Sequence, residues 1–281
     1  MTTRGFGTPG VWALAAVLLL AMPALAQMDD HPKDRPLTVG ADVGFAPFAF
    51  KTPAGEVTGF SVDFAREIAK RLGRPGLEVT DSKWSVIFAG LFAKRYEYIA
   101  APTNITKERA EQMLFTEPYM ATGLGFLIRQ DDQMKGVEDL KGKIVAVNSG
   151  SISDTWATEN AQSHGFEIQR YDKNADAVQA VLTRRAFANI SEVPTVAYIA
   201  TQQKQLKVGH NLYTGRNFGL AFRKDDIEFR NEVEKVVEAM KKDGSLAKLH
   251  EKWFGRPPDP GTAMTVVYEG FGAPGFPGYT K

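Results

Sequence analysis

The chain has 281 residues, of which 43% are hydrophobic, 34 are Lys or Arg, 33 are Asp or Glu, and none is Cys. Without Arg4, which lies in an N-terminal leader, 33 basic and 33 acidic residues remain. This balance argues against nucleic acid as a partner, because its phosphates favour a basic face. The absence of cysteine excludes disulfides and a lipid-modified N-terminal cysteine, so the hydrophobic core alone must hold the fold.

Residues 1–26 have the pattern of a secretory signal peptide. Arg4 gives a weakly positive start, residues 11–20 form an apolar run, and Ala24-Leu25-Ala26 is an A-x-A cleavage site. The apolar run is too short for a comfortable membrane span, and no second run approaches that length. We therefore expect a soluble protein in the periplasm, cleaved after Ala26. Residues 27–36 are polar and are expected to form a flexible leader.

From Leu37 onward, short strands alternate with amphipathic helices. The expected strands are 37–41, 77–79 and 98–101, with a hairpin over 50–59. One helix begins after a capping Ser61 and carries Phe64 and Ile68 on its apolar face; a second begins at Trp84. The alternation predicts an α/β fold with largely parallel strands.

A second unit of the same kind begins at Gly123. The expected strands are 124–128, 143–147, 166–171, 186–190 and 218–222, and the expected helices follow residue 154 and cover 175–182, 194–201, 226–242 and 245–253. Strand-like segments at 119–124 and 215–219 predict two lobes, each with its own mostly parallel sheet, joined by a hinge. The predicted lobe 1 comprises 37–122 and 217–256, and the inserted lobe 2 comprises 123–216. Residues 257–281 are rich in Gly, Pro and aromatics and are expected to form an ordered C-terminal arm. The sequence does not indicate a function for this arm.

Ligands of open α/β sheets lie beyond the carboxyl ends of the strands, and a cleft between two lobes is the natural site. The stretch 100–119 carries a strand end into a short helix with Thr106 as a plausible N-cap. Arg109 then lies in the first helical turn, where the helix dipole disfavours a cation. A guanidinium in such a place suits bidentate capture of a carboxylate, although an ion pair with Glu108 or Glu111 would also account for it.

Five segments, in combination and in this order, resemble the amino-acid family of periplasmic solute-binding proteins that serve ABC importers (bacterial extracellular solute-binding proteins, family 3). They are ADVGFAPFAF (41–50), GFSVDFAREIAKRLG (59–73), TNITKERAEQMLFTEPY (103–119), LKGKIVAVNSGS (140–151) and GSLAKLHEKWFG (244–255). The resemblance spans about 37–255. It implies the two-lobe type II periplasmic-binding-protein fold with hinge closure around a small solute.

The resemblance also implies a set of site residues. Arg109 matches the arginine that clamps the ligand carboxylate, and Glu192 falls where the family has the aspartate that binds the ammonium. Asn104 falls where the family usually has a Ser or Thr that contacts the ligand. Pro102 falls where the family commonly has a Gly or Ser that offers backbone groups, and its carbonyl is still available to an ammonium. The remaining residues are Ser151 and Ile152, at a helix start that suits an anion, and Asp42, Phe45 and Trp84, on loops that meet the ligand side chain.

These residues also have structural interpretations. Glu192 could complement a helix start, Asp42 could cap a local turn, and Phe45 and Trp84 could be core aromatics. Two departures from the family pattern bear on the ligand. Glu in place of Asp at 192 adds a methylene, and Asn104 with Pro102 changes the polar wall, so a ligand other than a plain α-amino acid stays open.

The sequence thus predicts a monomeric receptor that captures a small carboxylate-bearing solute, favouring a polar amino acid, and delivers it to an inner-membrane ABC permease. We expect no metal or other cofactor, because the four histidines lack metal-ligand spacing. Two alternatives remain: a dehydratase acting on a cyclic carboxylate, for which Glu192 or Asp42 would be the acid or base, and a receptor for a membrane sensor.

Overall fold

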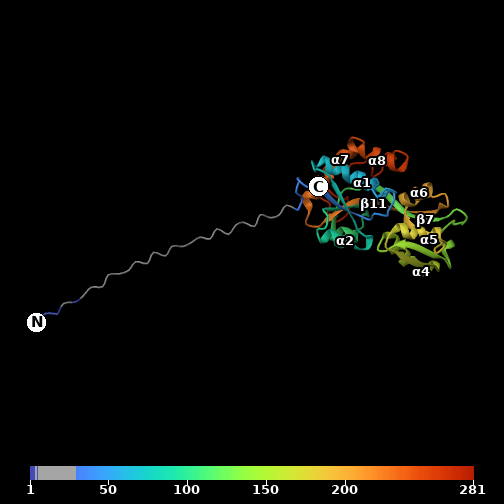
Figure 1. Cartoon of the computed structure of the whole chain (residues 1–281), viewed down its shortest axis with the longest axis horizontal. Helices are drawn as coiled ribbons and strands as arrows, with labels where there is room; N and C mark the ends of the chain where they lie inside the picture. The colour runs from blue at the N-terminus through green and yellow to red at the C-terminus, as the bar shows by residue number, and fades with distance from the viewer. Residues whose placement is uncertain (4, 6–29) are drawn as a thin grey trace. The chain divides into compact units, whose positions relative to one another are not determined.

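The computed structural model describes residues 1–3, 5 and 30–281. Arg4, the apolar run and the expected cleavage site after Ala26 lie outside the described residues. Residues 31–281 form one compact unit (Figure 1). No helix in the described part of the chain is both long enough and apolar enough to cross a membrane.

The first part of the unit alternates strands and helices as the sequence predicts. Its elements are β1 (Leu37–Ala41), β2 (Phe50–Lys51), β3 (Val57–Thr58), α1 (Phe60–Arg71), β4 (Leu77–Asp81), α2 (Trp84–Phe92), β5 (Tyr98–Asn104), α3 (Lys107–Gln112), β6 (Met113–Phe115) and β7 (Met120–Arg129). The predicted hairpin over 50–59 is confirmed as the antiparallel pair β2 and β3.

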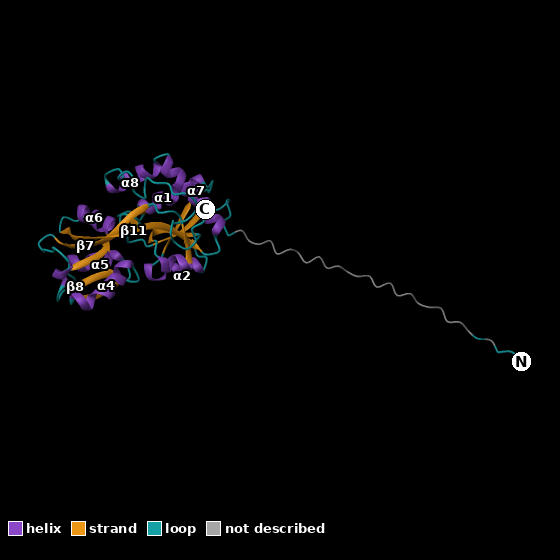
Figure 2. Ribbon diagram, turned by 180° about the vertical axis from the view of Figure 1, so that it is seen from behind, coloured by secondary structure: helices purple, strands orange, loops and turns teal. Residues whose placement is uncertain are grey.

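The second part continues this alternation and then returns to the first. Its elements are η1 (Val137–Leu140), β8 (Ile144–Asn148), α4 (Ile152–His164), β9 (Glu167–Tyr171), α5 (Asn174–Leu182), β10 (Ala188–Glu192), α6 (Val193–Gln202), β11 (Leu206–Arg223), α7 (Ile227–Lys242) and α8 (Ser245–Phe254). Figure 2 shows the strands between helices.

The strands form one continuous sheet in the order β4-β1-β5-β11-β7-β10-β8-β9, with β6 also paired to β11. The outer strands pair in parallel, which confirms the mixed α/β class. The prediction of two separate sheets is wrong, because β7 and β11 are long antiparallel partners that join both halves. Residues 207–217 of β11 are half-buried or exposed and largely polar. They therefore lack the alternation of apolar and polar residues that would predict a strand from the sequence.

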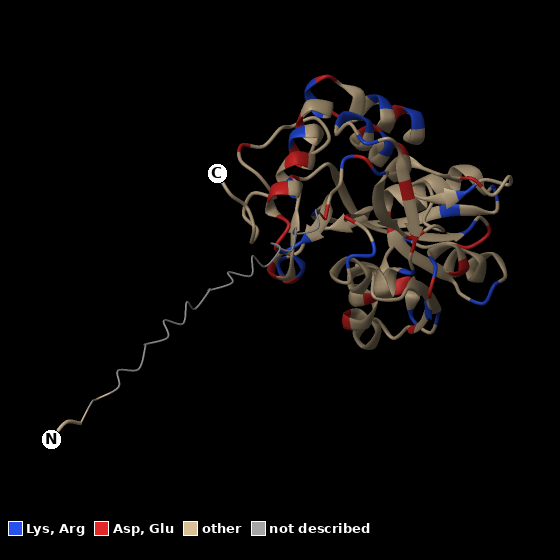
Figure 3. Cartoon of the chain, turned by 60° about the vertical axis from the view of Figure 1, so that its left-hand side comes forward, with Lys and Arg blue, Asp and Glu red and all other residues tan. Residues whose placement is uncertain are grey.

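The buried hydrophobic residues form separate clusters in the two halves of the fold that β7 and β11 join. Clusters built from residues 37–120 and 218–273 form one side. Clusters built from residues 124–212 form the other side. We use lobe 1 and lobe 2 for the ranges given above. Acidic and basic residues are interspersed along the helices of both lobes (Figure 3).

The first helix begins differently from the prediction. Its N-cap is Gly59 and its first residue is Phe60, so Ser61 lies inside the helix and is not the cap. Gly59 has a φ of 137°, and a Cβ there would lie 2.2 Å from the carbonyl oxygen of Phe48. The backbone of the loop after β1 therefore packs directly on the start of α1.

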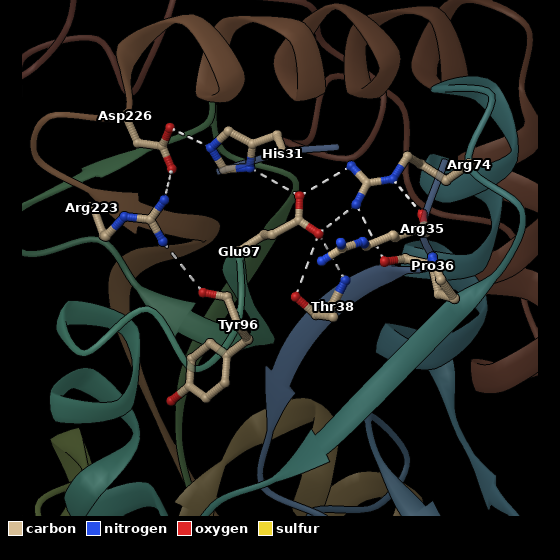
Figure 4. Close-up of polar contacts among 9 residues, drawn as sticks. All are labelled: His31, Arg35, Pro36, Thr38, Arg74, Tyr96, Glu97, Arg223 and Asp226. Carbon is tan, nitrogen blue, oxygen red and sulfur yellow. Dashed lines mark hydrogen bonds and ion pairs between the residues drawn. The ribbon is translucent and has the colours of Figure 1, made fainter. Parts of the chain in front are cut away.

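The two ends of the compact unit are docked on lobe 1. His31, in the middle of the expected flexible leader, stacks on Phe229 with ring centroids 3.8 Å apart, and its ring nitrogens contact Glu97 and Asp226 (Figure 4). In the C-terminal arm, Met264 is buried in the lobe 1 core. All four aromatic residues of the arm are half-buried, so polar contacts and small buried residues also hold it.

Candidate functional site

A cavity of about 30 Å³ lies between the two lobes. Because a water molecule needs roughly 10–15 Å³ of such space, the cavity has room for about two waters, and the lobes are closed on each other. Its lining residues come from both lobes: Asp42, Phe45, Trp84, Ala101, Pro102, Asn104, Asn148, Ser151, Ile152 and Glu192. The structure thus brings together every predicted site residue except Arg109, which lies beside the cavity.

The carboxyl ends of four strands position this lining. Asp42 follows β1, Asn104 ends β5, Asn148 ends β8 and Glu192 ends β10. β1 and β5 are parallel, and so are β8 and β10, so their carboxyl ends meet at one edge in each lobe. The position of the site at the carboxyl ends of the strands could therefore be predicted from the alternation of strands and helices in the sequence.

Glu192 joins the two lobes across the cavity. Its Oε1 accepts a hydrogen bond of 2.8 Å from Asn104 Nδ2, and its Oε2 accepts one of 2.6 Å from Thr122 Oγ1. Burial raises the pKa of the Glu192 carboxyl, and the two hydrogen bonds and the nearby Arg109 charge oppose that rise. The Glu192 carboxyl group is thus buried and held in a fixed orientation by a hydrogen bond to each of its oxygens.

Arg109 is oriented by the local fold of its own helix. Its backbone N–H donates to Thr106 Oγ1 at 3.3 Å, which confirms Thr106 as the N-cap of α3. The guanidinium donates to the Asn104 carbonyl oxygen at 3.2 Å and lies 5.5 Å from the Trp84 ring centroid and 5.2 Å from that of Phe88.

The guanidinium keeps donors available for an anion. Burial lowers the pKa of Arg109 to about 10, opposed by the charge of Glu192. No carboxylate lies within ion-pair distance of it among residues 30–281, so neither the predicted alternative of pairing with Glu108 nor that of pairing with Glu111 applies. The guanidinium lies within cation–π distance of two aromatic rings, which helps to hold it in place.

The start of α4 closes the lobe 2 side of the cavity. Ser151 caps the helix by accepting from the Asp154 N–H at 3.1 Å, while Asp154 Oδ2 accepts from the Gly150 N–H at 2.9 Å. Trp84 Nε1 of lobe 1 donates to the Gly150 carbonyl at 3.1 Å, which ties this turn to the opposite lobe. The first N–H groups of a helix lack partners within it and attract anions.

Asp42 has a partner that the sequence did not reveal. Its Oδ1 accepts from Lys173 Nζ of lobe 2 at 2.7 Å, and the same Nζ lies 2.6 Å from Asp81 Oδ1. Asp42 does not cap its own turn; the Val43 N–H donates to Asp81 instead. Sequence reasoning also missed Ala101, Asn148 and Thr122. Asn148 carried a signal, since it ends a strand just before the Gly-containing turn.

A larger hollow of about 730 Å³ lies elsewhere between α6 and α8. Its lining includes His250, Lys252 and Arg256 but no carboxylate and none of the predicted site residues. It offers no anion to an ammonium, whereas the small cavity brings Glu192 and Asp42 together near Arg109. We therefore take the small cavity as the candidate site.

Comparison with known proteins agrees with this geometry. Residues 37–256 match the model of bacterial extracellular solute-binding proteins, family 3. The chain is 30% identical over 252 residues to the L-cystine-binding protein of Escherichia coli (strain K12), covering 88% of this chain and 94% of that protein.

Two solved structures are also similar. An ancestral arginine-binding protein bound to arginine has a TM-score of 0.75 and 32% identity, covering 80% of this chain and 100% of that one. An ancestral amino-acid-binding protein described as a precursor of cyclohexadienyl dehydratase has a TM-score of 0.73 and 35% identity, covering 78% and 95%. The match across both lobes and the strand-end site lead to one conclusion: this chain belongs to family 3 of the bacterial extracellular solute-binding proteins.

Proposed function

We propose that this chain is a periplasmic receptor that captures a small carboxylate-bearing solute, a polar amino acid, by hinge closure and delivers it to an ABC importer. The observation that carries the proposal is the interlobe cavity with the anion of Glu192 in its wall and the Arg109 guanidinium beside it. A zwitterion needs one fixed cation and one fixed anion, and both are present here.

The two charged groups would divide the recognition of the ligand. Arg109 and the N–H groups at the start of α4 would hold the α-carboxylate, and Glu192 with the Pro102 carbonyl would hold the ammonium. Asn104 Oδ1 is buried and has no hydrogen-bond partner among the described residues, so it offers the ammonium a further acceptor. Phe45 and Trp84 would contact the ligand side chain.

Hinge closure would follow from the distribution of these groups. Arg109 and Asn104 belong to lobe 1, whereas Glu192, Ser151 and Ile152 belong to lobe 2, so only the closed form contacts both ends of the ligand. The antiparallel pair β7 and β11 supplies the two connecting strands. The relatives named above bind cystine or arginine, which supports an amino acid as the class of ligand.

The test is a thermal-melt screen of the ligand-stripped protein against the amino acids and small carboxylates. A ligand at a hundred times its dissociation constant adds about 2.7 kcal/mol to the free energy of unfolding, or roughly 5–10 °C in Tm. Arg109→Ala should weaken binding of the hit at least tenfold, since a charge-assisted hydrogen bond is worth about 1.5–3 kcal/mol. Arg109→Ala with unchanged affinity would refute the assignment.

A dehydratase is the second candidate, and its support is the similarity to an ancestral precursor of such an enzyme. Glu192 or Asp42 would serve as acid or base. We favour a binding protein without enzymatic activity, because Glu192 is held by two hydrogen bonds and Asp42 by Lys173. Recovery of the bound compound unchanged after prolonged incubation would support the receptor, and turnover would support the enzyme.

The partner follows from the family. We propose an inner-membrane ABC permease that docks the closed form, with the receptor acting as a monomer after removal of residues 1–26. A membrane sensor is the alternative partner. Ligand-dependent co-purification with an ABC permease would support the importer, and ligand-dependent co-purification with a membrane sensor would support the alternative.

A further inference from the structure

We propose that Lys173 is a tethered counter-ion that occupies the place of a ligand's side-chain cation, so that the receptor selects neutral amino acids against basic ones. The inference rests on the proposed function and specifies its class of substrate. Asp42 is the cavity-lining carboxylate that could otherwise attract the positive side chain of arginine or lysine. Lys173 pairs with it from the opposite lobe.

The geometry of the Lys173 contacts carries this proposal. Asp42 is 2% exposed, and its Oδ1 lies 2.7 Å from Lys173 Nζ. The same ammonium lies 2.6 Å from Asp81 Oδ1, so it bridges two lobe 1 carboxylates. The Lys173 stem passes along the loop after β1, where a Cβ at Gly44 would lie 3.6 Å from Lys173 Cδ.

A basic ligand would have to displace this ammonium to reach Asp42. A cationic side chain that approached Asp42 would be repelled by the Lys173 ammonium, which already lies 2.7 Å from that carboxylate. A neutral ligand meets no such repulsion. The Lys173 side chain is 22% exposed and thus largely desolvated, so its loss from Asp42 would not be fully compensated by water.

One atom of Asp42 stays available to a neutral ligand. Its Oδ2 is buried and has no hydrogen-bond partner among the described residues. A buried acceptor without a partner is costly, and a ligand hydroxyl or amide N–H would satisfy it. The cavity therefore suits a side chain with a neutral donor.

The chain offers a matched control in Lys83. Its Nζ lies 2.5 Å from Asp172 Oδ2, so it also makes an ion pair between the lobes, but Asp172 does not line the cavity. Lys83→Met removes an interlobe ion pair without changing the charge at Asp42. Lys173→Arg keeps the charge and is the conservative variant.

The experiment is isothermal titration of wild type and the three variants with L-arginine and its neutral isostere L-citrulline, with melts to verify folding. Wild type should bind citrulline more tightly than arginine. Lys173→Met should shift the arginine-to-citrulline affinity ratio at least tenfold towards arginine, whereas Lys83→Met and Lys173→Arg should leave it within about twofold. If wild type binds neither, Lys173→Met should gain arginine binding alone.

An unchanged ratio in Lys173→Met, or arginine binding to wild type as tightly as citrulline, would overturn the role of Lys173. That failure differs from failure of the proposed function, which would be silence from every amino acid in the melt screen. A parallel shift of the ratio in Lys83→Met would also overturn the inference, because it would trace the effect to lobe closure and not to Asp42.

Discussion

Asn104 Nδ2 of lobe 1 lies 2.8 Å from Glu192 Oε1 of lobe 2, although 88 residues separate them in the chain. The two groups belong to the ends of β5 and β10, and both line the candidate site. The contact joins the two sides of the site, and Arg109 donates to the backbone carbonyl of the same Asn104. A change at Glu192 should therefore alter ligand binding and the stability of the closed form separately.

Glu192→Gln should weaken binding of an α-amino acid at least tenfold, because the ammonium loses its buried anion. Burial raises the pKa of Glu192 above its value in the unfolded chain. Ionisation of Glu192 therefore destabilises the unliganded protein, and this cost grows as the pH rises from the pKa of the unfolded state through the pKa of the folded state. The variant should thus be at least as stable as wild type at pH 7. Titration and denaturant unfolding of the same preparation measure both effects. A large loss of stability with intact binding would contradict this role.

The His31 contacts predict a pH-dependent stability. Burial alone lowers the pKa of His31, but hydrogen bonds to Asp226 and Glu97 outweigh it and raise the pKa to about 9 (Figure 4). Since the folded pKa exceeds the unfolded 6.5, the stabilisation is complete below about pH 6.5 and is lost as pH rises through about 9. Its size is at most roughly 3 kcal/mol.

The measurement is the free energy of unfolding of wild type and His31→Gln from pH 6 to 10. The difference between them should be largest at pH 6 and should shrink towards pH 10. Arg74 and Arg223 also contact these carboxylates, so the two acids keep partners in the variant. A pH-independent difference for His31→Gln would refute the prediction.

The C-terminal arm is held by a buried ion pair. The side chains of Lys241 and Glu117 are both 0% exposed, with Nζ 2.7 Å from Oε1. Lys241 also donates to the Val266 carbonyl, and Glu117 accepts from the Tyr268 N–H. Both partners therefore bind the arm as well as each other.

Lys241→Met should destabilise the fold by about 3–5 kcal/mol, because it leaves the Glu117 charge buried without its partner. The double variant Lys241→Met/Glu117→Gln should recover part of this loss, since it removes the uncompensated charge. Denaturant unfolding of the two single variants and the double variant measures the coupling. Additive losses would show that the pair does not act as a unit.

Gly59 couples the start of α1 to the loop that carries Phe45. Gly59→Ala should destabilise the protein by more than about 2 kcal/mol and weaken ligand binding, because the new Cβ would meet the Phe48 carbonyl at 2.2 Å. Gly55→Ala is the control that separates the strain of a positive φ from the steric clash of the new Cβ. Gly55 also has a positive φ, of 85°, but a Cβ there would meet nothing within 4 Å. Equal effects of the two substitutions would refute the steric account.

The sequence by itself determined the α/β class and the edge of the fold at which the site lies. Periodicity is a local property, so alternating strands and helices can be read directly, and parallel strands bring their carboxyl ends to one edge. The resemblance to the family then implied Asp42, Asn104 and Glu192 as site residues, and all three line one cavity. Even the Thr106 cap of α3 was readable, because capping acts within one helical turn.

The tertiary structure alone decided which groups meet across the lobes. Lys173 reaches Asp42 over 131 residues, and Glu192 reaches Thr122 over 70. It also decided that β7 and β11 join the sheet, since the polar middle of β11 is ordered by pairing with β7. The reason is physical: the partner of a side chain at the interface depends on how the two lobes pack against each other. No local sequence pattern encodes the distance between residues of different lobes.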